Sequence, residues 1–158
     1  MNRNRLVAAA LGTLLSVACL PGQTQTATDN FLVTITIADN CTIAAQDLDF
    51  GTRTVLNANF DVNSIITVNC SVGTIYTVSL NQGVNGARLM SDGSATVDYE
   101  LYTSALRVLA WGENVGVDTV SGTGNGANQD LTVYGRVPVQ ATPAPATYND
   151  TITATIAF

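Results

Sequence analysis

Residues 64–80, SIITVNCSVGTIYTVSL, contain two segments of alternating residues joined by a short turn. Residues 64–70 and 75–80 are rich in isoleucine, valine and threonine, and their apolar side chains recur at every second position, which is typical of β-strands. The three residues 72–74, Val-Gly-Thr, form a turn signal between them. The stretch therefore predicts two successive strands joined by a turn.

The same pattern extends over most of the chain, and no stretch shows a sustained 3.6-residue apolar period. Glycine- and asparagine-rich turns separate the segments, at residues 81–86, 91–94 and 121–127. Many short strands at this spacing predict an all-β fold, an immunoglobulin-like β-sandwich in one domain. The further predicted strands are residues 30–38, 97–102, 107–111, 131–139 and 148–158.

The first 27 residues have the three-part layout of a secretory signal peptide. A basic start with Arg3 and Arg5 precedes the apolar run 6–20, and a polar segment of small residues follows. We expect residues 1–27 to be removed on export, with cleavage after Ala18 as the alternative. Cys41 and Cys70 would then be the remaining cysteines, and an even pair in an exported protein predicts one disulfide bond.

The composition argues against most catalytic and cofactor chemistry. The chain has 158 residues with 12 acidic and 6 basic side chains, all six of them arginine, and it has no histidine and no lysine. The usual general base and metal ligand is therefore missing, and so is the lysine of Schiff bases and P-loops. The acidic balance disfavours nucleic acid. We expect no catalytic residue, no metal and no cofactor.

Four motifs leave a chemical role open. Asp98 and Glu100 share one face of a predicted strand and could form a glycosidase pair, but we favour a solvated strand face beside core residues. Residues 47–49, Asp-Leu-Asp, could join a calcium site, although no EF-hand pattern supports it. Residues 122–126 resemble a phosphate loop superficially, and we expect a turn. Trp111 could stack on a sugar, but a core position is the commoner outcome.

Both ends of the predicted domain carry strands without an obvious partner. In residues 30–38, Phe31, Val33, Ile35 and Ile37 share one face, and threonines lie on the other. The last predicted strand runs to Phe158. The strand of one molecule could complete the sheet of the next and so build a fibre, or it could fold back into its own sandwich. Periodicity alone leaves these two solutions open.

A set of short motifs follows in order along the chain from Cys41, at residues 41–43, 47–51, 64–70, 76–80, 88–90, 99–102, 111–112, 133–137 and 148–152, together with Gly83. With these motifs the chain resembles the spore coat protein U domain family, whose best-known members are subunits of Csu-type archaic chaperone–usher pili. One departure is that the family usually has a glycine just before the tyrosine of the last strand, where this chain has residues 143–147, Pro-Ala-Pro-Ala-Thr.

The resemblance implies a structural, non-enzymatic role in an extracellular pilus that supports surface adhesion and biofilm formation. The fold would be an incomplete immunoglobulin-like β-sandwich (residues 40–158) completed by a donor strand from a neighbouring subunit. Residues 28–39 would be that donor segment, inserted through Phe31, Val33, Ile35 and Ile37, and the family disulfide maps onto Cys41 and Cys70. The C-terminal strand would line the receiving groove through Tyr148, Ile152, Ile156 and Phe158.

The implied partners are neighbouring pilus subunits, a periplasmic chaperone and an outer-membrane usher. The protein would be exported to the periplasm and then to the cell surface, without being membrane-embedded. A tip adhesin is a second interpretation, disfavoured because a tip subunit would carry an additional binding domain. The chain could instead be a secreted or spore-coat structural protein, a carbohydrate-binding β-sandwich or a small carboxylate hydrolase.

Overall fold

The computed structural model describes residue 22 and residues 24–158, and in this part of the chain the regular elements are all β-strands. The chain divides into two units, Met1–Thr36 and Ile37–Phe158. The predicted signal peptide, residues 1–27, lies outside the described residues except for 22 and 24–27. Residues 24–36 of the first unit form no strand, so the strand predicted over residues 30–38 is not formed.

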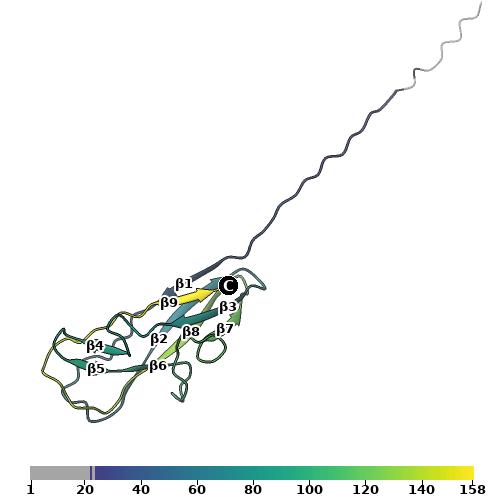
Figure 1. The fold of residues 1–158 in the computed structure, drawn as a ribbon. Helices are drawn as coiled ribbons and strands as arrows, with labels where there is room; N and C mark the ends of the chain where they lie inside the picture. Colours follow the sequence, from purple (N-terminus) through teal and green to yellow (C-terminus); the bar gives the residue numbers. More distant parts are fainter. Residues whose placement is uncertain (1–21, 23) are drawn as a thin grey trace, which may run out of the picture. The chain divides into compact units, whose positions relative to one another are not determined.

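The second unit consists of antiparallel sheets, which confirms the all-β prediction (Figure 1). The strands are β1 (Cys41–Ala45), β2 (Phe60–Cys70), β3 (Ile75–Leu80), β4 (Leu89–Ser91), β5 (Thr96–Asp98), β6 (Glu100–Tyr102), β7 (Val120–Thr123), β8 (Asn128–Val137) and β9 (Ala154–Ala157). One sheet has the order β1-β2-β8-β6, a second has the order β7-β3-β9, and β4 pairs with β5.

The core lies between the two larger sheets because their central strands alternate. Every second residue of β2, from Ser64 to Cys70, is buried, and so is every second residue of β3 from Tyr76 to Leu80. Val133 and Val137 of β8 join the same cluster. The two strands predicted from residues 64–80 are therefore confirmed, and they belong to different sheets.

The outward face of the large sheet is held by polar pairs between neighbouring strands. Asp61 of β2 lies opposite Arg136 of β8, whose Nε and Nη2 donate to its two carboxylate oxygens at 2.7 and 2.8 Å. These hydrogen bonds with Arg136 hold the pKa of Asp61 below its ordinary value of 3.8. Thr67 likewise donates to Asp130 at 2.7 Å. Polar residues on this face thus stabilise the register that the buried face requires.

Three predicted strands are wrong in their extent. The strand predicted at residues 131–139 is β8, which begins at Asn128 and ends at Val137. Residues 97–102 divide at Tyr99, because β5 pairs with β4 whereas β6 pairs with β8. The last predicted strand, residues 148–158, contracts to β9, and its earlier part contributes a bridge between Asn149 and Ser91. Prolines at residues 143 and 145 lie in the approach to this strand, where an extended, irregular chain suits them.

The strand predicted at residues 107–111 does not form. Arg107 has a φ of +52°, which belongs to a turn, and one bridge joins Ala110 to Tyr102. The Arg107 side chain lies over β2 and β8, where Nη2 donates to Asn63 at 3.2 Å and Nε lies 3.4 Å from Asp61. The apolar run therefore forms a loop fastened by its arginine. The strands β1, β4 and β7 were not predicted.

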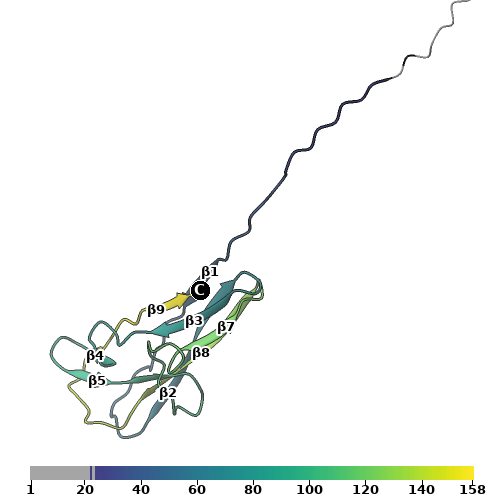
Figure 2. The ribbon, with the colours of Figure 1, turned by 45° about the vertical axis from the view of Figure 1, so that its right-hand side comes forward.

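Each of the two larger sheets ends in strands with an edge that pairs with no other strand of the described chain, β1 and β6 in one sheet and β7 and β9 in the other. β1 is bonded to β2 alone, and β9 is bonded to β3 alone. These two edge strands lie beside each other although they belong to different sheets, as both ribbon views show (Figures 1 and 2). An unpaired edge presents free N–H and C=O groups that can bind another strand.

Candidate functional site

A groove of about 1040 Å³ opens between the sheets at this side of the second unit. One wall is the end of β1 and the loop that follows it, from Ala45 to Thr54. The other wall is the segment that leads into β9, from Thr142 to Ala154. The floor is apolar and comes from both sheets, with Ile66, Leu80, Val97, Leu101, Val133 and Val137 among its residues.

The wall after β1 is packed rigidly by the motif Asp-Leu-Asp-Phe-Gly. Leu48 and Phe50 point inward, and a Cβ at Gly135 would lie 2.8 Å from Leu48 Cδ1 and 3.1 Å from Phe50 Cζ. Asp49 Oδ1 accepts from the N–H of Gly51 at 2.7 Å, and Gly51 has a φ of +70°. Asp49 thus has a structural role, because its side chain shapes the turn.

The opposite wall is held by a hydrogen bond between Tyr99 and Asp150. The Tyr99 hydroxyl donates to Asp150 Oδ2 at 2.7 Å, and both residues line the groove. Asp150 Oδ1 also accepts from the Asn85 side chain at 3.2 Å. Burial and the hydrogen bond with this carboxylate raise the pKa of Tyr99 far above its ordinary value of 10.0. The hydroxyl therefore remains a donor that positions the chain entering β9.

Arg88, to which the sequence pattern assigned no role of its own, lies behind this wall and is 2 % exposed. Its Nη2 donates to the carbonyl oxygens of Trp111 at 2.7 Å and Leu80 at 3.2 Å. Its Nε lies 4.0 Å from Glu100 Oε1. The one sequence feature that could have singled out Arg88 is the scarcity of basic residues in an acidic chain. The burial of its side chain cannot be seen in the sequence.

Of the four C-terminal residues that were predicted to line the groove, two line it and two lie beyond it. Tyr148 and Ile152 line the groove. Ile156 lies on the same face of β9 as Ala154, is partly buried and packs against the core, and Phe158 at the end of the chain is 60 % exposed. The four residues of the predicted donor segment are all exposed: Phe31 87 %, Val33 79 %, Ile35 84 % and Ile37 85 %.

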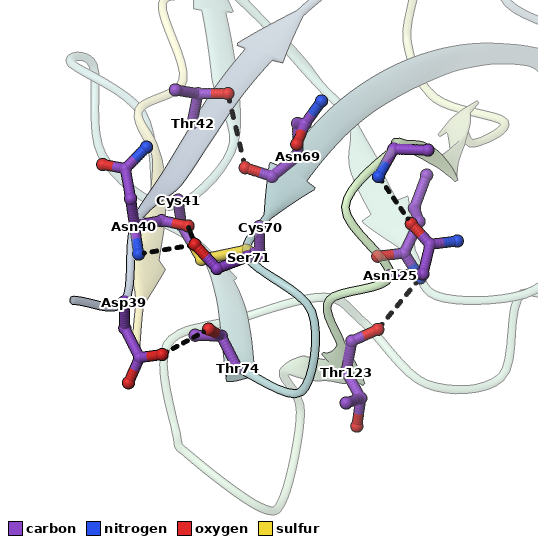
Figure 3. The surroundings of a disulfide bond; sticks show 12 residues. Asp39, Asn40, Cys41, Thr42, Asn69, Cys70, Ser71, Thr74, Thr123 and Asn125 are labelled. Carbon is purple, nitrogen blue, oxygen red and sulfur yellow. Dashed lines mark hydrogen bonds between the residues drawn. A yellow bond between two sulfur atoms is a disulfide. The ribbon is translucent and has the colours of Figure 1, made fainter. Parts of the chain in front are cut away.

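The expected disulfide bond is present and fastens β1 to the core. Cys41 and Cys70 are direct partners in the antiparallel register of β1 and β2, with an S–S distance of 2.00 Å (Figure 3). Cys70 is completely buried, whereas Cys41 is the first residue of an edge strand. The bond therefore joins the start of the domain to one of its central strands.

The motifs with an open chemical role take structural positions. Trp111 is 1 % exposed and its Nε1 donates to the Val78 carbonyl at 2.9 Å, so the core interpretation is confirmed. Glu100 faces Arg88, whereas Asp98 is exposed. Among residues 22 and 24–158 no three His, Cys, Asp or Glu side chains gather as a metal site would require. Nor does that part of the chain include a helix with the length and apolarity to cross a membrane.

Residues 27–155 match the family model described as the Spore Coat Protein U domain. The chain belongs to the Spore Coat Protein U domain family. The match includes the groove, the disulfide bond and the exposed segment before β1. Among curated proteins no match was found.

A solved structure supports the same relationship. It is the crystal structure of the CsuC–CsuE chaperone–tip adhesion subunit pre-assembly complex from archaic chaperone–usher Csu pili of Acinetobacter baumannii. The similarity has a TM-score of 0.60 at 27 % sequence identity and covers 78 % of this chain. This chain corresponds to 41 % of the matched chain, so it spans less than half of that protein's length.

Proposed function

We propose that this Spore Coat Protein U domain protein is a structural subunit of an extracellular chaperone–usher pilus and has no catalytic role. The observation that supports the proposal most directly is the groove beside two edge strands, β1 and β9, whose outer edges pair with no strand of the described chain. A strand added there would bind the free N–H and C=O groups of an edge and cover the apolar floor. The domain is then an immunoglobulin-like sandwich that lacks one strand.

Residues 29–38 of a second subunit are the strand that we propose for this groove. Phe31, Val33, Ile35 and Ile37 lie at every second position, so in an extended chain they point to one side. Burying one such side chain contributes about 1.5–3 kcal/mol, so four contribute about 6–12 kcal/mol before ordering costs. Side chains this exposed are otherwise a liability for an exported protein.

The same groove defines the other partners and the destination. A subunit with an open apolar groove aggregates unless the groove is covered, so a periplasmic chaperone would occupy it first. An outer-membrane usher would then exchange the chaperone for residues 28–39 of the next subunit. The matched tip subunit was crystallised with its chaperone, which is consistent with this sequence of events. The protein would be exported through residues 1–27, and the fibre would support surface adhesion and biofilm formation.

The test is a pair of variants that place two charges on opposite faces of the same segment. Val33→Asp with Ile35→Asp should leave the chaperone complex intact but abolish attachment to the next subunit, because two charges would enter an apolar groove. Thr34→Asp with Thr36→Asp is the matched control, since these side chains would face away from the groove. The measurement is fibre formation by electron microscopy alongside recovery of the chaperone complex.

Two results would refute this function. Fibres formed by the Val33/Ile35 variant would show that the segment is not a donor strand. Loss of the chaperone complex in that variant, with the Thr34/Thr36 control unaffected, would show that the segment belongs to the subunit's own fold.

A further inference from the structure

The two residues before the disulfide bond are fastened to the turn between β2 and β3. The Thr74 hydroxyl donates to Asp39 Oδ1 at 2.8 Å, and the Asn40 N–H donates to Ser71 Oγ at 3.2 Å. The Ser71 N–H donates in turn to the Asn40 carbonyl at 2.9 Å. Figure 3 shows these contacts on the same side of the domain as the disulfide bond. We call Asp39, Asn40, Ser71 and Thr74 the junction lock.

The junction lock holds the chain in the direction of β1. The last register pair of β1 and β2 is Cys41 with Cys70, and the bond from Ser71 to Asn40 continues this pairing by one position. Neither Asp39 nor Asn40 is among the residues with positive φ. The chain therefore enters β1 without the left-handed conformation of a two-residue hairpin turn at these two residues.

The local sequence would otherwise favour a reversal here. Asp and Asn are among the residues that best tolerate the left-handed conformation of a two-residue hairpin turn. A turn at Asp39-Asn40 would send residues 29–38 back along the free edge of β1, over the groove of the same molecule. A turn further upstream, at Ile37-Ala38, would remove Ile37 from the set of four anchors and would place a β-branched residue in the turn.

We propose that the junction lock prevents residues 29–38 from closing the groove of their own molecule and so commits this segment to a second copy of the chain. The inference rests on the proposed function, since it assumes that the segment fits the groove. The inference explains why the segment enters the groove of a second molecule and not the groove of its own. The turn-forming residues Asp39 and Asn40 are hydrogen-bonded to Thr74 and Ser71 and neither has the positive φ of a two-residue hairpin turn, so closure within one molecule lacks its natural turn. A fibre results because the segment is prevented from entering the groove of its own molecule.

The experiment compares exported protein without its chaperone in two hydroxyl-deleted variants. Ser71→Ala with Thr74→Val removes both side-chain partners of the lock and keeps Asp39 and Asn40 in place. Thr77→Val with Ser121→Ala removes an exposed hydrogen bond of 3.0 Å between β3 and β7 and serves as the matched control. Native mass spectrometry over a dilution series measures the fraction of monomer that is independent of concentration and resists urea.

We expect the lock variant to raise the fraction of closed monomer about tenfold over wild type, because two hydrogen bonds that oppose the turn are lost. The control should match wild type. Adding Val33→Asp and Ile35→Asp to the lock variant should eliminate the closed monomer, which identifies residues 29–38 as the closing strand. A lock variant that assembles like wild type, without added closed monomer, would overturn the inference.

Failure of the proposed function gives a different result. If wild type and its Val33/Ile35 variant have the same oligomer distribution, residues 29–38 do not drive assembly and the proposed function itself fails. If the lock variant does not fold, a second variant decides. Two glycines inserted between Ala38 and Asp39 leave the lock bonds intact and supply a turn, so closed monomer is expected. Its absence would overturn the inference.

Discussion

Reduction of the Cys41–Cys70 disulfide should destabilise the domain and release β1 first. The sequence separation is 29, so the bond closes a loop of about 30 residues, and the chain-entropy relation gives about 3–4 kcal/mol. Cys70 is fully buried, whereas β1 is an edge strand bonded to β2 alone. Without the covalent bond, β1 depends on its backbone ladder and on partly buried Ile43. We therefore expect a global loss of stability and a larger local loss at β1.

The assay is equilibrium urea unfolding of the exported protein with and without reductant, followed by amide hydrogen exchange at pH 7. Reduction avoids the cavity that a substitution at buried Cys70 would create. Amides of β1 should exchange sooner than those of β8, because strands fray from an unsupported edge. Thiol counting on denatured, unreduced protein is the control and should find no free thiol in the mature chain. A stability change below about 1 kcal/mol, or equal exchange in β1 and β8, would refute the reasoning.

Two further predictions concern the walls of the groove. Tyr99→Phe should make the free energy of unfolding less dependent on pH in the alkaline range. In wild type, the raised pKa of Tyr99 contributes stability below pH 10.0 that is lost as the pH rises toward the folded-state pKa. Urea unfolding of the variant and of wild type at several alkaline pH values measures this loss. Gly135→Ala should destabilise the domain by about 1–3 kcal/mol, because the new Cβ displaces Leu48 and Phe50. The same displacement should weaken binding of a peptide of residues 28–39. An unchanged peptide affinity in fluorescence anisotropy would contradict this prediction.

The sequence was most informative where a strand is central in its sheet. β3 was predicted at its observed bounds and β2 over its buried half, because a strand covered on one face must alternate whichever strand lies beside it. Edge and short strands were missed for the converse reason. β4 has only three residues, all partly buried, so it shows no alternation of buried and exposed residues from which a strand could be predicted.

Wrong strand predictions came from long-range contacts that no local pattern encodes. Residues 107–111 are an apolar run that predicts a strand. The Arg107 side chain nevertheless contacts Asp61 and Asn63 of β2, which lie more than forty residues earlier in the chain. The division at Tyr99 likewise depends on β5 meeting β4 while β6 meets β8. Tertiary pairing overrides propensity at such places.

By itself the sequence determined the strand content, the cysteine pair, the lack of histidine and lysine, and one apolar face over residues 29–38. These depend on residue identity and on a period of two, which are local properties. Tertiary structure decided which strand edges stay unpaired in the described chain, that β1 and β9 lie side by side, and that Asp39 and Asn40 are hydrogen-bonded to Thr74 and Ser71. A groove and a lock consist of residues distant in the chain, so they exist only once the sheets have packed.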